Sequence, residues 1–128
     1  MIDHVSISVS DLARATSFYE KILFPLGLAI LAERETTTGF GKKYPEFWLN
    51  LRDGESAPSD ASSGTHVALR ATSIATVKAF HKAALDNGGS CDGPPGPREA
   101  TYPGYYAAFI FDPDGNRIEA VTFVEDEG

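Results

Sequence analysis

The stretch HVSISVSDLARATSFYEKILFPLGL, residues 4–28, returns as HVALRATSIATVKAFHKAALDNGGS at residues 66–90. The two stretches align without a gap at an offset of 62 residues. Identical residues occupy six pairs of positions, which are His4/His66, Val5/Val67, Ala13/Ala75, Phe18/Phe80, Leu23/Leu85 and Gly27/Gly89. These pairs fall at corresponding places in the expected elements, so the alignment indicates an internal repeat in which each copy is one structural unit.

Each copy is predicted to be a strand followed by a helix. In residues 4–9 and 66–71 apolar and polar side chains alternate, which predicts strands that carry both histidines on the polar face. Ser10-Asp11 and Thr72-Ser73 offer side-chain acceptors for the free N–H groups at a helix start. Helices are expected over residues 12–24 and 74–87, where apolar side chains recur at helical spacing until Pro and Gly residues end them.

Strand-like sequence follows each helix. In the first half the expected strands are residues 28–34, 36–43 and 46–51, and in the second half 105–111 and 117–123. Between the last two, the segment DPDGN at 112–116 predicts a hairpin turn, because Pro presets φ and Gly accepts a positive φ. Residues 88–103, with Pro94-Pro95-Gly96-Pro97, are expected to form an irregular functional loop.

Each half therefore approximates β-α-β-β-β, and the expected fold class is α+β. Two paired βαβββ modules would form an open, curved mixed sheet around a shared cavity, because a half of this length is marginal alone. The predicted organisation is a single domain over residues 1–128. Its parts are module one at 1–52, a linker at 53–64, module two at 65–124 and a tail at 125–128.

Composition excludes several classes of partner. The chain has 128 residues and a net charge of −7, so phosphate backbones and anionic membrane surfaces would repel it. It has neither a basic leader nor an apolar run of about 18 residues, and a cytoplasmic location without membrane contact is expected. The one cysteine, Cys91, excludes an internal disulfide and a cysteine-rich zinc site.

Three side chains are candidates for a metal site. The repeat gives His4 and His66 equivalent positions facing the cavity, and Glu119 lies on the polar face of the apolar last strand. A carboxylate at such a position is costly to bury unless it is paired or binds a cation. Two histidines and one glutamate suit a divalent first-row metal. The alternative is that Glu119 pairs with Arg117 or Arg70 and the histidines are ordinary strand residues.

The modules that open on His-Val, together with the closing DPDGNRIE at 112–119, resemble the vicinal oxygen chelate superfamily. That superfamily includes glyoxalase I, extradiol dioxygenases, fosfomycin-resistance transferases and bleomycin-resistance proteins. The resemblance covers essentially the whole chain. It implies His4, His66 and Glu119 as ligands of a divalent ion (Zn, Ni, Mn, Fe or Co), a small-molecule substrate and a homodimer. The cavity would form either within one chain or across two chains.

The fourth ligand of glyoxalase-like sites has no clear counterpart. Aligning residues 117–123 with 46–52 puts Trp48, which cannot ligate a metal, opposite Glu119. Glu46 lies two residues earlier on the same strand face and is a possible fourth ligand after a register shift. The three-ligand pattern makes glyoxalase I chemistry itself doubtful and resembles dioxygenase and fosfomycin-transferase sites instead.

Further residues are candidates for substrate contact. Trp48 and Asn50 share the inward face of their strand, and Arg98 offers a cation for an anionic group. Three tyrosines, Tyr102, Tyr105 and Tyr106, flank the entry to the second-module hairpin, and one of them could offer a phenolic donor or acid. Glu119 and Tyr106 are the predicted catalytic residues. For Trp48 and the tyrosines, simple core or turn packing is the alternative.

Three functions remain open at this point. The first is a small metal-dependent enzyme of glyoxalase or dioxygenase type, with lyase or isomerase chemistry on a substrate that chelates the metal through vicinal oxygens. The second is a non-enzymatic protein that sequesters a drug or another ligand, like bleomycin-resistance proteins. The third is a fosfomycin-type thiol transferase, for which the sequence offers no evident cluster of Lys and Arg.

Overall fold

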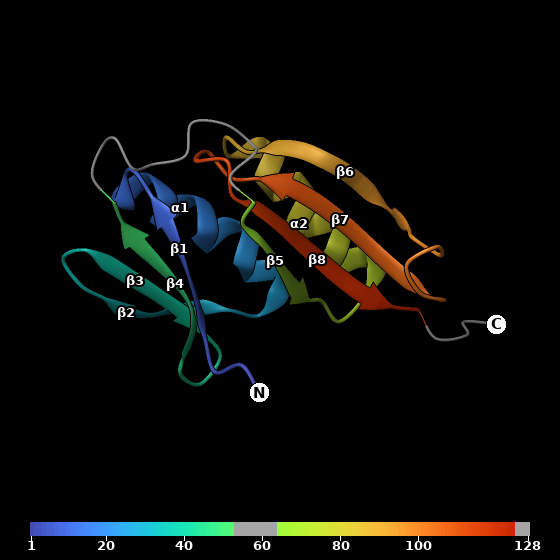
Figure 1. Ribbon diagram of the computed structural model, residues 1–128, viewed down its shortest axis with the longest axis horizontal. Helices are drawn as coiled ribbons and strands as arrows, with labels where there is room; N and C mark the ends of the chain where they lie inside the picture. Colours follow the sequence, from blue (N-terminus) through green and yellow to red (C-terminus); the bar gives the residue numbers. More distant parts are fainter. Residues whose placement is uncertain (53–63, 125–128) are drawn as a thin grey trace.

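The computed structural model describes residues 1–52 and 64–124, which form two successive β-α-β-β-β units (Figure 1). The first unit, module one, consists of β1 (Val5–Val9), α1 (Leu12–Leu23), the short 3-10 helix η1 (Phe24–Leu26), β2 (Ala29–Glu33), β3 (Thr37–Gly41) and β4 (Pro45–Leu51). The second unit, module two, consists of β5 (His66–Arg70), α2 (Ile74–Asp86), β6 (Ser90–Pro97), β7 (Tyr105–Phe111) and β8 (Arg117–Phe123).

The two modules have the same sheet topology. The strand order is β1-β4-β3-β2 in one sheet and β5-β8-β7-β6 in the other. The pairs β1/β4 and β5/β8 are parallel, and the remaining pairs are antiparallel, so both sheets are mixed and open. The predicted fold class, two paired βαβββ modules of the α+β class, is confirmed.

Side-chain caps begin both helices where the sequence predicts them. The Asp11 carboxylate accepts from the Arg14 backbone N–H at 3.0 Å, and the Ser73 hydroxyl accepts from the Thr76 N–H at 3.1 Å. Helix α1 passes into η1, which ends at Gly27 with a φ of 83°, a conformation that glycine adopts without strain. These boundaries keep each helix short enough to cover one sheet.

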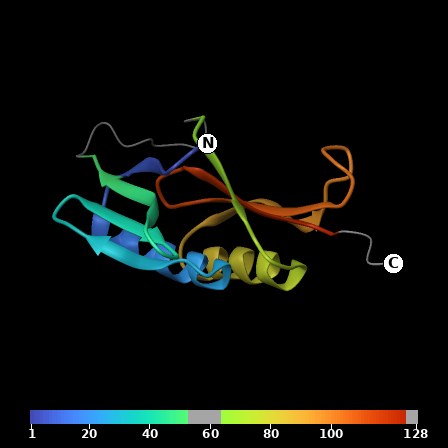
Figure 2. The same cartoon turned by 90° about the horizontal axis from the view of Figure 1, so that it is seen from below.

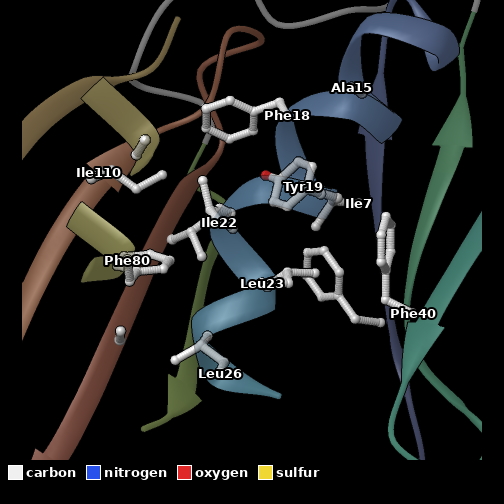
Figure 3. Packing of buried hydrophobic residues seen from close by; sticks show 14 of the residues in the cluster. Ile7, Ala15, Phe18, Tyr19, Ile22, Leu23, Leu26, Phe40, Phe80 and Ile110 are labelled. Atoms are coloured by element: carbon white, nitrogen blue, oxygen red, sulfur yellow. The ribbon is translucent and has the colours of Figure 1, made fainter. Parts of the chain in front are cut away.

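Both helices lie on the same side of the molecule, with the sheets on the other (Figure 2). The helices pack against each other and against the sheets, so one core runs through both modules. Figure 3 shows Ile22 of α1 on the side of Phe80 of α2 and Leu23 on the side of Phe40 of β3, with Phe18 turned toward the side of Ile110. Each such apolar side chain contributes roughly 1.5–3 kcal/mol when it is fully buried.

The DPDGN segment at 112–116 is a buried hub as well as a turn. One Asp112 oxygen accepts from the backbone N–H groups of Asp114 and Asn116, at 2.9 and 2.8 Å. The other oxygen accepts from the Tyr19 hydroxyl at 2.6 Å and from the Asn116 amide at 2.9 Å. Burial raises the pKa of Asp112 above its ordinary value, although these hydrogen bonds act in the opposite direction.

This hub clamps module two onto module one. The Asn116 amide donates to the Ser8 carbonyl at 2.9 Å, and the Asp114 carboxylate accepts from the Ser10 N–H and hydroxyl at 3.1 and 2.5 Å. Burial, followed by the nearby Asp112 carboxylate, raises the pKa of Tyr19 well above its usual range, so its hydroxyl remains a donor. The hairpin of module two is thus attached to the first strand and helix of module one.

The predicted irregular loop at 88–103 is wrong for its first half. Residues Ser90–Pro97 form the edge strand β6, whose pairing with β7 shifts register twice around Gly93. Glycine and proline are poor strand formers, but an edge strand with bulges accommodates both. The expected linker at 53–64, except its last residue, and the expected tail at 125–128 lie outside the described residues. No helix in the described ranges is long and apolar enough to cross a membrane.

Candidate functional site

Each sheet has one face turned away from the helices, which we call its open face. Along β5, His66 and Arg70 point to the open face of module two, because Val67 and Leu69 pack on the core. Glu119 on β8 lies on the same face, directly opposite Phe109 of β7. Alternation along the strands therefore collects polar and aromatic side chains on a surface that the helices do not cover.

Glu119 is the buried centre of this surface. The residue is 1% exposed, and its two side-chain oxygens have different partners. One lies 2.8 Å from His66 Nε2, and the other accepts a short hydrogen bond from the Tyr105 hydroxyl. Burial and the hydrogen bond to Glu119 raise the pKa of Tyr105 to about 12, so the phenol keeps its proton at neutral pH. The carboxylate is thus paired by His66 and Tyr105, not by Arg117 or Arg70.

Two arginine guanidinium groups lie over the ring of Phe109, close to His66. The guanidinium groups of Arg98 and Arg117 lie 5.5 and 4.6 Å from the Phe109 ring centroid, and the His66 ring lies 6.1 Å from it. Arg117 is neutralised by Asp92 at 2.5 Å, whereas Arg98 donates only to the carbonyls of Pro94 and Pro97. Arg98 therefore brings a positive charge to the site without a carboxylate partner among the described residues.

The open face of module one is built differently. Trp48 and Asn50 of β4 lie with His4, Ser6 and Thr37 around a hollow of about 440 Å³, which confirms that Trp48 and Asn50 share one face. Two carbons of the Trp48 ring lie close to Gly39, where an added Cβ would be 2.9 Å from both. The guanidinium of Arg34 covers the ring from 4.9 Å. Trp48 therefore contacts both Gly39 and Arg34.

The three predicted metal ligands are divided between the two sheets. His66 and Glu119 are in contact on module two. His4 lines the hollow on module one, where its Nδ1 bonds the Asp3 carboxylate at 2.7 Å. In residues 1–52 and 64–124, no three His, Cys, Asp or Glu side chains gather closely enough to hold a metal ion.

The remaining predicted site residues are scattered. Tyr106 packs against the core on the opposite face of β7 from Glu119, and the tyrosine that contacts this carboxylate is Tyr105. Glu46 lies outside the cluster, with one oxygen 3.5 Å from the Lys42 N–H. Tyr102 is 61% exposed and stacks edge-on against Phe123. It lines a broad open depression of about 1210 Å³ that also includes Arg70 and Tyr105.

Sequence reasoning missed the arginines on aromatic rings. Arg34, Arg70, Arg98 and Arg117 all lie over rings of the open faces, and among these only Arg98 stands among the predicted substrate contacts. Arg70 is four residues from His66, and Arg117 is two residues from Glu119, so strand alternation puts each arginine on the same face as its neighbour. That even spacing is the signal that could have identified these two arginines. Arg34 follows the end of β2, and no strand alternation predicts its place over Trp48.

Comparison with known proteins supplies a family description. A model of the glyoxalase/bleomycin resistance protein/dioxygenase superfamily matches residues 1–120. Comparison with curated proteins gave no match.

Among solved structures, a glyoxalase/bleomycin resistance protein from Albidiferax ferrireducens T118 is 30% identical, with a TM-score of 0.82 over 94% of this chain and 97% of that one. A family enzyme from Burkholderia phytofirmans PsJN is 16% identical, with a TM-score of 0.72 over 96% and 98% of the two chains. A fosfomycin resistance protein from Listeria monocytogenes is 18% identical, with a TM-score of 0.67 over 99% and 96%. The last two likenesses concern the fold alone.

Proposed function

The chain belongs to the glyoxalase/bleomycin resistance protein/dioxygenase superfamily, and on this premise we propose that it is a small metal-dependent enzyme. Its substrate is a small molecule that chelates a divalent metal through two neighbouring oxygens. The reaction is of lyase or isomerase type, in which negative charge develops on a substrate oxygen. His66, Glu119 and His4 are the proposed ligands.

The contact between His66 and Glu119 carries this proposal. An imidazole nitrogen and a carboxylate oxygen lie 2.8 Å apart on an open sheet face, and the carboxylate is almost fully buried. Burying a carboxylate is costly, and a nearby cation is one way to offset that cost. Nitrogen and oxygen donors of this kind suit divalent first-row metals. The donor set therefore fits half of the proposed metal site.

The other half lies on module one. His4 faces the hollow beside Trp48 and does not join His66 and Glu119 in one cluster. A second copy of the chain that lays its module one against this module two would bring a His4 to the pair. We therefore propose a homodimer whose two sites each use His66 and Glu119 of one copy and His4 of the other.

When bound, the metal supplies a Lewis acid that stabilises developing charge on the substrate oxygen. Tyr105 positions Glu119, because its phenolic hydroxyl donates a hydrogen bond to the carboxylate. No glutamate corresponds to Glu119 on module one, because Trp48 holds that place, so the proton-transferring glutamate of glyoxalase I is not part of this proposal. Arg98 orients an anionic part of the substrate beside His66.

Binding of Co²⁺ to the purified, metal-stripped protein tests the proposed ligands. We expect His66→Ala and Glu119→Gln to weaken Co²⁺ binding by about 100-fold or more, measured by calorimetry and by the absorption of the bound ion. His81→Ala is the matched control, since the chain has three histidines and His81 lies on α2. Unchanged Co²⁺ affinity in His66→Ala would exclude the proposed site.

A mixing experiment tests the shared site. Neither His4→Ala nor His66→Ala alone should bind Co²⁺ well. If the site is shared, a mixed dimer restores one intact site, because one copy supplies His66 with Glu119 and the other supplies His4. Restoration after the two variants are unfolded and refolded together supports the shared site. Failure to restore binding in mixed dimers, verified by mass, means that the ligands do not come from two copies.

A second candidate is group transfer to a phosphonate, as in fosfomycin-type thiol transferases. The observation in its favour is the Arg98 guanidinium over Phe109 beside His66, which has no carboxylate partner among the described residues. A metal-dependent fosfomycin-resistance assay in bacteria that express the chain tests it. Sequestration of a cationic drug is disfavoured, because the four ring-stacked arginines lie on the open faces.

A further inference from the structure

The hollow on the open face of module one has a composition that the proposed metal site does not explain. Arg34, Ser6, Thr37 and Asn50 surround it together with Trp48. Within the described part of the chain, the side chains of Ser6, Thr37 and Asn50 make no hydrogen bond, and Arg34 has no carboxylate within ion-pair distance. Polar groups that converge on one hollow without protein partners are suited to a ligand.

The position of Arg34 depends on two paired residues of neighbouring strands, Gly39 and Trp48. Gly39 of β3 is paired with Trp48 of β4, and the missing Cβ lets the indole ring lie on the backbone. The ring in turn carries the Arg34 guanidinium 4.9 Å from its centroid. A guanidinium over an aromatic ring keeps N–H groups available for a ligand, and those of Arg34 have no carboxylate partner in the described part of the chain. Trp48 is thus a platform for Arg34, and Arg34 is the surface that a ligand meets.

The charge around the hollow favours an anion. The chain has a net charge of −7, yet four of its six arginines lie over rings on the open faces. The one carboxylate that lines this hollow, Asp3, is engaged by His4 at 2.7 Å. A guanidinium without a carboxylate partner matches the two oxygens of a carboxylate or phosphoryl group.

We propose that Arg34, mounted on Trp48, binds the oxyanion group of the substrate, either a carboxylate or a phosphoryl group. The inference deepens the proposed function and rests on it, because in the proposed dimer module one of one copy holds the molecule on which module two of the other copy acts. Ser6 and Thr37 supply hydroxyl groups, and Asn50 an amide, for the remaining oxygens of the same ligand.

Trp48 is the only tryptophan in the chain, so its fluorescence reports directly on this hollow. The metal-stripped protein is titrated with sodium benzoate, with inorganic phosphate and with neutral benzamide, and calorimetry repeats each titration. We expect saturable binding of benzoate or phosphate and none of benzamide. Benzoate alone identifies a carboxylate ligand, and phosphate alone identifies a phosphoryl ligand.

Substitution of Arg34 then tests its role. Arg34→Gln should weaken oxyanion binding by about tenfold or more, and Arg34→Lys by less, because lysine keeps the charge but loses the planar fork. Lys78→Gln on α2 is the matched control with the same change in charge and should bind like the native protein. Circular dichroism melting verifies that each variant is folded.

Three outcomes overturn the inference. They are equal oxyanion affinity in Arg34→Gln and the native protein, benzamide binding as tight as benzoate binding, and no calorimetric binding of either oxyanion. None of these measurements uses a metal or turnover. Failure here with intact Co²⁺ binding at His66 and Glu119 therefore removes Arg34 alone, whereas loss of the Co²⁺ site removes the proposed function.

Discussion

Trp48 and Glu119 occupy the same place in the two halves of the molecule. Trp48 pairs across the sheet with Ser6, and Glu119 pairs with Ala68, which lies 62 residues after Ser6. In module two the position holds a buried carboxylate with two hydrogen-bonding partners, and in module one it holds an indole ring beneath an arginine. The two halves keep one backbone plan and present different chemistry.

Replacement of Gly39 tests how tightly Trp48 is seated. In Gly39→Ala the new Cβ lies 2.9 Å from two carbons of the Trp48 ring and from the Pro45 Cβ, so the ring must move. We expect the free energy of unfolding to fall by about 1–3 kcal/mol, measured by urea denaturation, with a change in tryptophan emission. In a Trp48→Phe background the cost should be smaller, because the two crowded ring carbons are gone. If Gly39→Ala lowers the free energy of unfolding equally in the native protein and in Trp48→Phe, the Trp48 ring is not what limits the space at Gly39.

Substitution of Tyr105 tests its role as the partner of Glu119. Tyr105→Phe removes the hydroxyl that donates to the carboxylate, so Co²⁺ affinity should fall by about 10- to 100-fold. Tyr106→Phe is the matched control, because the neighbouring tyrosine packs on the core face and has no contact with Glu119. Calorimetry with Co²⁺ measures both. Equal losses in the two variants would assign the effect to general destabilisation.

The clamp between the modules predicts a large cost for Asp112→Asn. Each carboxylate oxygen of Asp112 accepts two hydrogen bonds. In Asp112→Asn one of these oxygens becomes an NH₂ group, which cannot accept a hydrogen bond and would face two donors. We expect a loss of about 1–3 kcal/mol in the free energy of unfolding. Asp86→Asn, which alters an exposed pair with Lys82, should leave the free energy of unfolding almost unchanged. A comparable loss of stability in both variants would contradict the claim that the buried hydrogen bonds of Asp112 stabilise the fold.

The same carboxyl group predicts a pH effect. Burial raises the pKa of Asp112 above its ordinary 3.8, so the folded protein holds this proton at a pH where the unfolded chain has lost it. Stability from this group is therefore full at low pH and declines as the pH rises from 3.8 through the raised pKa. The free-energy difference between the native protein and Asp112→Asn should narrow across that window and then stay constant. If this free-energy difference widens with rising pH, the pKa of Asp112 is lowered in the folded protein, and the prediction is wrong.

The repeat and the hydrophobic periodicity were sufficient to predict the fold. Alternation in β1 and β5 correctly separates the core face from the face that carries the histidines. The strand β6 was missed because its glycines and prolines mask the pairing that the neighbouring β7 imposes on an edge. Local sequence preference does not contain that tertiary contact.

The candidate site was predictable only where it follows strand alternation. Parity places His66 and Glu119 on one face, and the parallel register brings them together. The bounds of β7 were predicted correctly, but which of Tyr105 and Tyr106 faces Glu119 depends on the register of β7 with β8, where Phe109 pairs with Glu119. Arg34 lies beyond the end of its strand, so its contact with Trp48 arises from tertiary packing that no sequence period encodes.

The clamp at residues 112–116 also bears on how the repeat folds. Its donors and acceptors include Ser8, Ser10 and Tyr19 of module one, more than 90 positions earlier in the sequence. The last hairpin therefore reaches its native hydrogen bonding only after the first strand and helix are in place. Although each half has the pattern of an independent unit, we expect a single cooperative unfolding transition in which neither half persists without the other.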